Sequence, residues 1–470
     1  MVFSSLVFLF VFLPFFLLGY HLISDRYKNG FALLASLLFY FWGAPDFILI
    51  AIASIIVDYY LVYLIALSSS TKRLVLLWVS ILFNLSFLLY YKYFNFFVDN
   101  LNELLGEGNT YEIATIILPI GISFFTFQKI SYSIDIYRKT APPLKSLRDY
   151  ALYIMLFPQL IAGPIVRYNE IADQLHHRKF SDYNDRIYGI YRFAIGLAKK
   201  VIIANVLGEK ADLIFNLEAV DLNASIAWLG IVCYTFQIYF DFSGYSDMAI
   251  GLGRLMGFKF PENFNSPYVA QSITEFWKRW HITLGSWMRD YLYIPLGGNR
   301  VGSTGRLYLN LWVVFIISGF WHGASWNFVL WGAYHGVFLI FDRLFLNRLT
   351  KPVGKLGRVV LTFFVVMLGW VLFRSENFAE AMTYYTALFS FDFSSVHLFV
   401  SAKFYRVLAI AILLSFLFLF NRIAGGYQRF VDSVSISSQL SKTIVGVFLI
   451  SVSVANLAGS GFNPFIYFRF

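Results

Sequence analysis

Residues 311–323 read LWVVFIISGFWHG and are the most informative part of the chain. Its apolar run ends on a histidine, His322, which lies between Trp321 and Gly323. A second histidine beside tryptophan, His281, ends the stretch QSITEFWKRWH at residues 271–281. A titratable imidazole at membrane depth is costly, so it is usually retained for proton chemistry or for a buried polar contact.

The rest of the chain is equally apolar. Of its 470 residues, 59% are hydrophobic and 14% are charged, whereas a soluble domain has about a quarter charged residues. Apolar runs of about 20 residues are typical of spanning helices rather than barrel strands. We predict an all-α polytopic transmembrane protein with roughly 11–13 membrane segments, some of them re-entrant or interfacial. The candidate segments are residues 2–20, 30–48, 48–67, 74–91, 113–136, 149–166, 187–206, 225–250, 308–321, 326–345, 357–374, 404–421 and 442–458.

No repeat or low-complexity linker divides the chain. We expect one integral membrane domain over residues 1–470, with core motifs at about 118–375 and C-terminal helices at 400–460. The first 20 residues lack a basic start and a cleavage site, so they indicate a first span rather than a signal peptide. Cys233 is the only cysteine, which excludes intrachain disulfides and cysteine-rich metal sites. No base adjoins it, so a small core residue is favoured over a thiol nucleophile.

Charged residues between the segments predict the orientation. The net charge of +10 does not by itself imply a nucleic-acid partner. Basic residues follow the first, third and fifth segments: Arg26, Lys28, Lys72, Arg73, Arg138, Lys139, Lys145 and Arg148. The loop from Val98 after the fourth segment is acidic, with Asp99, Glu103, Glu107 and Glu112. Because basic loops stay in the cytoplasm, the N-terminus should be extracytoplasmic.

Residues 251–308 form a segment too polar to cross lipid. Helical spacing and tryptophans at 277, 280 and 287 predict a helix from Ser272 to Tyr293 that lies at the membrane interface or dips into the protein. Its cations have two interpretations: contact with anionic lipid heads, or binding of the phosphates of a nucleotide-bearing donor. No Walker-type or dinucleotide glycine motif accompanies them, so ATP hydrolysis and hydride transfer lack support.

Two interpretations also stay open for each of the two histidines. His322 is either a buried histidine that donates to a carbonyl, or a general base that takes a proton from a hydroxyl. His281 either shares a pocket with His322 or lies at the membrane interface. Lys278 and Arg279, if close, would lower the pKa of His281 and favour neutral imidazole. The pair offers too few ligands for a metal and matches no zinc spacing, so we predict no metal site.

The other histidines are expected to be structural: His335 in helix packing, His176 and His177 in a solvated loop. Asp241 and Asp247 lie inside an apolar segment and must be paired or line a wet cavity. They would orient a histidine, bind an arginine of the basic segment, or act directly. Asp58 and Asp135 also lie within apolar segments, so each of them must likewise be paired or line a wet cavity.

With these residues in view, the chain resembles the membrane-bound O-acyltransferase (MBOAT) family. The likeness is strongest to the branch that contains the integral membrane subunit of alginate O-acetylation. The matching stretches are residues 118–124, 157–164, 239–253, 272–300, 321–324 and 369–374.

The resemblance implies a bowl of tilted helices around a funnel or tunnel, with catalytic His322 at its centre. The preceding family histidine maps onto His281, where other branches have Asn or Asp. It also implies acetyl-CoA as the cytoplasmic acyl donor, with no tightly bound cofactor, in the bacterial inner membrane. Transfer to an extracytoplasmic polysaccharide would involve partners of the SGNH acetyltransferase type. Substrate contacts are expected from Lys278, Arg279, Arg289, Arg300, Trp321, Asp241 and Asp247.

Three alternatives remain. In the first, the acceptor of the acetyl group is an alginate-like polymer. In the second, it is peptidoglycan or another surface glycan. In the third, the transferred group is D-alanyl and the acceptor is teichoic acid. A protein of another class, a non-catalytic transporter of glycan or lipid precursors, is less well supported. Transporters usually show repeat symmetry and paired half-helices, which this sequence lacks. A covalent acetyl-histidine is also left open.

Overall fold

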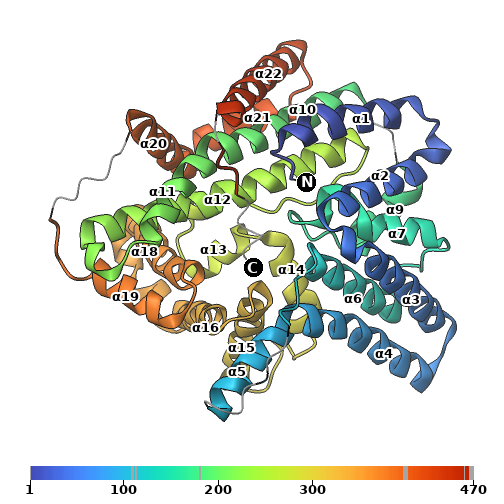
Figure 1. The fold of residues 1–470 in the computed structure, drawn as a ribbon, viewed down its shortest axis with the longest axis horizontal. Coiled ribbons are helices and arrows are strands. Elements are labelled where there is room, and N and C mark those ends of the chain that lie inside the picture. The colour runs from blue at the N-terminus through green and yellow to red at the C-terminus, as the bar shows by residue number, and fades with distance from the viewer. Residues whose placement is uncertain are drawn as a thin grey trace. The chain divides into compact units, whose positions relative to one another are not determined.

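The computed structural model describes residues 2–106, 111, 114–178, 182–394, 401–459 and 461–464. Throughout this described part the regular elements are helices, without a strand (Figure 1). The all-α prediction is therefore confirmed. The chain divides into two compact units. The first unit comprises Met1–Arg186 with Leu252–Pro261, and the second comprises Ile187–Gly251 with Glu262–Phe470.

The first unit contains the N-terminal helices. They are η1 (Phe8–Phe12), α1 (Leu13–Leu22), α2 (Lys28–Gly43), α3 (Ile48–Leu67), α4 (Ser70–Leu88), α5 (Phe94–Leu105), α6 (Ile122–Arg138), α7 (Leu147–Met155), α8 (Phe157–Leu160) and α9 (Tyr168–His176). The acidic loop predicted from Val98 begins only after Leu105, because α5 continues to that residue. Glu107 and Glu112 of that predicted loop lie outside the described residues.

The second unit contains the helices that carry the histidines. They are α10 (Tyr183–Ala198), η5 (Lys199–Ala204), α11 (Asn205–Phe215), α12 (Ala224–Leu255), α13 (Ile273–Arg279), α14 (Ile282–Met288), η8 (Arg289–Tyr293), α15 (Thr304–His322), α16 (Trp326–Phe341), α18 (Gly354–Arg374), α19 (Phe378–Leu388), α20 (Ala402–Phe416), α21 (Asn421–Asp432) and α22 (Ile436–Gly459). An aromatic core that includes Tyr268, Phe276, Trp331 and Trp370 packs between them.

Seven helical stretches of the described residues are long and apolar enough to cross a membrane. They are Pro45–Leu67, Ser70–Leu105, Ala224–Leu255, Trp326–Leu349, Lys351–Arg374, Ala402–Leu419 and Ile436–Gly459, and each coincides with a predicted segment. Phe8–Leu22 is apolar but shorter. The segment predicted at 149–166 is interrupted, because α7 ends at Met155 and Pro158 opens the short helix α8. The protein is thus a multi-pass membrane protein.

The interfacial helix predicted from Ser272 to Tyr293 is broken. α13 ends at Arg279, and His281 takes a left-handed backbone conformation, with φ 44° and ψ 54°, before α14 begins. A left-handed residue cannot continue a right-handed helix. The break places His281 at the start of a new helix instead of on the side of a continuous one.

Candidate active site

His322 is the last residue of α15, which packs backbone to backbone against α16. A Cβ added to Gly319 would lie 2.1 Å from the Phe328 carbonyl oxygen, and one added to Gly332 would lie 2.3 Å from that of Phe315. Glycines at such a crossing let two membrane helices approach closely. The tight α15–α16 pair therefore holds His322 in a defined position at the end of its helix.

The His322 ring lies in an aromatic enclosure. Its side chain is 7% exposed. Its ring centre lies 5.0 Å from that of Trp321, 5.3 Å from Trp331 and 5.3 Å from Phe373. Three different helices supply these neighbours, so the apolar walls of the site depend on the packing of α15, α16 and α18.

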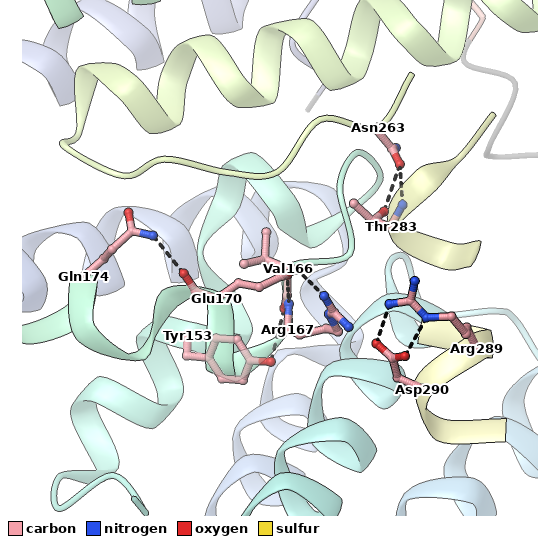
Figure 2. A network of polar contacts seen from close by, with 9 residues as sticks. All are labelled: Tyr153, Val166, Arg167, Glu170, Gln174, Asn263, Thr283, Arg289 and Asp290. Atoms are coloured by element: carbon pink, nitrogen blue, oxygen red, sulfur yellow. Dashed lines mark hydrogen bonds and ion pairs between the residues drawn. The ribbon is translucent and has the colours of Figure 1, made fainter. Parts of the chain in front are cut away.

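His281 caps α14 and is held by a buried polar cluster. It is 2% exposed, and its Nδ1 lies 3.2 Å from the Asn263 Oδ1. Asn263 also accepts from the Thr283 hydroxyl at 2.9 Å and donates to the Ser246 hydroxyl at 3.1 Å. Figure 2 shows the Asn263 side chain directed at Thr283. Asn263 sits in a coil without any motif, so sequence reasoning missed it.

The tautomer of His281 follows from its two Nδ1 contacts. The Asn263 oxygen requires a proton on Nδ1, whereas the Leu284 N–H, at 3.4 Å, requires a bare Nδ1. The contact to Asn263 is shorter, so we assign the proton to Nδ1. The lone pair of Nε2 is then available, and among the described residues Nε2 has no hydrogen-bond partner.

His281 is neutral at physiological pH. Burial lowers its pKa to about 3, because the charged imidazolium would lose its hydration. The predicted direction was right, but the predicted cause was wrong. Arg279 is neutralised by Glu275 at 2.8 Å, and Lys278 is exposed to solvent.

The structure brings the two histidines together. Their ring centres are 6.5 Å apart, at an interplanar angle of 62°. The Trp321 ring lies 6.4 Å from that of His281. A group bound between the rings would touch both imidazoles, so the geometry suits proton transfer to or from one small substrate group.

The third buried histidine, His335, lies apart from this pair in the packing of α16. Its ring centre is 4.9 Å from Trp277 and 5.1 Å from Trp331. A Cβ added to Gly369 would lie 2.7 Å from its Nε2. His335 therefore fills a tight gap between α16, α13 and α18.

The four basic residues that were expected to contact the substrate differ in their surroundings. Arg279 pairs with Glu275. Arg289 pairs with Asp290 at 2.7 Å, and Figure 2 draws these two side chains beside each other. Lys278 and Arg300 are exposed and make no ion pair with any described residue. A polyanionic ligand would thus meet Lys278 and Arg300 without displacing an existing ion pair.

The two carboxylates of α12 are ion-paired with cations of the preceding helices. Asp247 accepts from Arg192 at 2.7 Å and from Lys199 at 2.7 Å. Asp241 lies 3.0 Å from Lys200. These partners come from α10 and η5, and not from a histidine or from the basic segment. The carboxylates thus join α12 to α10 and η5.

Asp58 and Asp135 lie in the first unit. Asp58 accepts hydrogen bonds from Ser80 at 3.0 Å, from Asn84 at 2.5 Å and from the Tyr150 hydroxyl. Its donors come from α4 and α7, so this carboxylate connects α3 with both. Asp135 is buried in α6.

Sequence comparison adds an independent observation. The pattern described as "MBOAT, membrane-bound O-acyltransferase family" matches residues 138–383, a range that contains His281, His322 and Asn263. A probable alginate O-acetylase of Pseudomonas aeruginosa is 47% identical over 83% of this chain and 75% of its own length. One of Azotobacter vinelandii is 41% identical over 100% of both chains. A peptidoglycan O-acetyltransferase of Helicobacter pylori is 39% identical over 81% of this chain and 78% of its own.

Proposed function

Because this chain belongs to the membrane-bound O-acyltransferase family, we propose that it transfers an acetyl group from cytoplasmic acetyl-CoA to an extracytoplasmic polysaccharide. The membrane would be the bacterial inner membrane, with the N-terminus outside, as the basic loops predict. An alginate-like polymer is favoured as the acceptor, because two relatives that align over most of this chain are named probable alginate O-acetylases.

One observation supports this chemistry above others: two buried histidines lie beside one another, with their ring centres 6.5 Å apart and their ring planes at 62°. His322 acts as general base and takes the proton of the acceptor hydroxyl, whose oxygen attacks the thioester carbonyl. The tetrahedral intermediate collapses, the carbon–sulfur bond breaks, and the imidazolium returns its proton to the leaving thiolate. The transferred acetyl group ends on the acceptor oxygen, and His322 is regenerated.

His281 and Trp321 position the reacting groups. Neutral His281 accepts a hydrogen bond at Nε2 from a donor on the substrate, while Asn263 holds Nδ1. The Trp321 indole carries an N–H of the kind that stabilises a developing oxyanion. The donor phosphates contact Lys278 and Arg300, because these exposed cations have no ion pair to break.

The experiment that tests this function replaces His322 with alanine. Acetyl transfer from labelled acetyl-CoA should fall by at least about a hundredfold, the usual contribution of a general base. Membrane insertion should be unchanged, because a single uncharged substitution leaves the spanning helices intact. His177→Ala is the matched control, since His177 is exposed and its side chain pairs with the exposed Asp173. If a stably expressed His322→Ala protein transferred acetyl at the wild-type rate, His322 would not be a catalytic residue.

A second acceptor is supported by one relative. The Helicobacter pylori protein, at 39% identity, is named a peptidoglycan O-acetyltransferase. Offering alginate-like polymer and peptidoglycan to the same membranes, with the extracytoplasmic acetyltransferase present, discriminates between the two. Acetyl ester on the glycan strands alone would replace the alginate-like assignment and leave the reaction class unchanged.

A further inference from the structure

A cavity of about 70 Å³ lies in the second unit, where η9 (Asp342–Leu346) and α17 (Asn347–Leu349) lead from α16 towards α18. A water-sized group needs about 10–15 Å³ on this scale, so the cavity holds about five such groups. Phe338 and Leu361 line its apolar side, and Ser272, Asp342, Arg358 and Thr362 line its polar side. The size and lining suit a small, charged headgroup.

Arg358, which lines this cavity, has an unused donor. Its Nη2 donates to the Asn347 side chain at 3.3 Å. Its Nε is shielded from solvent and lacks a hydrogen-bond partner among the described residues. In that part of the chain no carboxylate lies within ion-pair range of Arg358 either. A buried guanidinium N–H without an acceptor is unfavourable, and phosphate, like carboxylate, has a geometry that fits it.

Asp342 supplies the opposite charge. Its carboxylate is buried, and one oxygen accepts the Thr274 backbone N–H at 2.7 Å. Across the residues that the structure describes, no lysine or arginine pairs with it. A buried carboxylate without a counterion is destabilising. The cavity therefore presents an unmatched cation and an unmatched anion, which suits a ligand that carries both a phosphate and an ammonium group.

The surroundings point to a membrane lipid rather than a soluble molecule. Residues 343–358 contain no acidic residue and five basic ones, Arg343, Arg348, Lys351, Lys355 and Arg358. Exposed apolar side chains lie among them, including Leu344, Leu349, Leu356 and Leu361. Basic clusters beside membrane helices attract lipid headgroups, and the leucines offer a surface for acyl chains.

We propose that this cavity binds the headgroup of an aminophospholipid, with its phosphate on Arg358 and its primary ammonium on Asp342. The substrate pair of the proposed reaction has no part in this site. The binding measurement needs no acetyl donor, so its result is independent of that function.

The test is native mass spectrometry of the purified full chain with phosphatidylethanolamine, phosphatidylglycerol or phosphatidylcholine. The wild-type protein should retain one phosphatidylethanolamine in preference to the other two. Arg358→Gln should weaken retention of phosphatidylethanolamine and of phosphatidylglycerol by at least about tenfold, because both lose the charged phosphate contact.

Asp342→Asn should weaken retention of phosphatidylethanolamine by a similar factor and leave retention of phosphatidylglycerol unchanged. The asparagine oxygen can still accept the Thr274 N–H, so the fold is preserved. Lys351→Gln is the control, because Lys351 is exposed and does not line the cavity. The Lys351→Gln protein should retain phosphatidylethanolamine as the wild type does.

Four outcomes would overturn the proposal. Equal retention of phosphatidylglycerol by the wild type would make this a general anionic-lipid site. Displacement of the lipid by equimolar free phosphoethanolamine would assign the site to a soluble ligand, and displacement by acetyl-CoA would make it part of the donor site. Unchanged phosphatidylethanolamine binding in Asp342→Asn would remove the ammonium contact.

Discussion

His281 serves two purposes through one backbone conformation. Its left-handed φ of 44° ends α13, and the residue occupies the N-cap position of α14, with its Nδ1 3.4 Å from the Leu284 nitrogen. The same conformation turns the ring towards Asn263 and leaves Nε2 available. Since Asn tolerates this backbone region well and is a good N-cap, His281→Asn removes the imidazole Nε2 while retaining the local fold.

The acid sensitivity of the protein should depend on His281. Its pKa is about 3 in the folded state and 6.5 ordinarily, so between these values only the unfolded chain takes up the proton. The free energy of unfolding therefore falls as the pH falls through this window, by up to about 1.4 kcal/mol per pH unit. Above pH 6.5 this group has no effect.

Unfolding of wild type and His281→Asn in detergent, from pH 7.5 to 4.5, measures this contribution. The wild type should lose more stability on acidification than His281→Asn. The slopes of their free energies of unfolding against pH should differ by an amount that approaches the uptake of one proton. The other titrating groups are present in both proteins, so their contributions cancel in the difference between the two pH profiles. Parallel pH profiles would mean that His281 is protonated in the folded state.

At the scale of elements, the α15–α16 contact decides where His322 lies. Gly319→Ala would place a methyl group 2.1 Å from the Phe328 carbonyl oxygen, so the helices must separate. We expect a loss of about 1–3 kcal/mol in stability, as for other overpacked sites, together with reduced acetyl transfer. Thermal unfolding and transfer rates measure both.

The matched control for this prediction lies in the same helix. Gly305→Ala adds a methyl group at the start of α15, where nothing lies within 4 Å. It should be neutral or slightly stabilising, because alanine favours the helix. Equal behaviour of the two variants would show that the α15–α16 approach does not constrain His322.

For the whole molecule, binding of the acetyl donor should depend on exposed cations. The double variant Lys278→Glu/Arg300→Glu should raise the Michaelis constant for acetyl-CoA and change kcat less, because charge-assisted phosphate contacts stabilise the bound donor. Lys72→Glu/Lys145→Glu reverses two other exposed charges and should have no effect. An unchanged Michaelis constant would favour contact with lipid heads for Lys278 and Arg300.

The chain should also need a partner to modify a long polymer. Among the described residues the segments between helices are short, far below the about 100 residues of a typical domain. Vesicles with acetyl-CoA inside and polysaccharide outside should therefore yield little product until an extracytoplasmic acetyltransferase is added. Full polymer acetylation by this chain alone would make it a complete transferase.

Sequence reasoning predicted some parts of the site and missed others for a physical reason. His322 stood out because imidazole is rare at the end of a long apolar run, and His281 stood out as a second histidine beside a tryptophan. Asn263 did not, because an asparagine between prolines is ordinary in a loop. The helical spacing from Ser272 to Tyr293 also hid the break at His281, since periodicity reports which face is apolar and not whether the backbone stays helical.

The sequence by itself determined the helical membrane class. In lipid each backbone group must be satisfied locally, so apolar composition and run length suffice to predict helices. The tertiary structure alone decided that His281 and His322 lie beside each other with ring centres 6.5 Å apart, that burial and not Lys278 or Arg279 keeps His281 neutral, and that Asn263 orients it. These properties arise from contacts between residues distant in the chain, and no local pattern encodes such contacts.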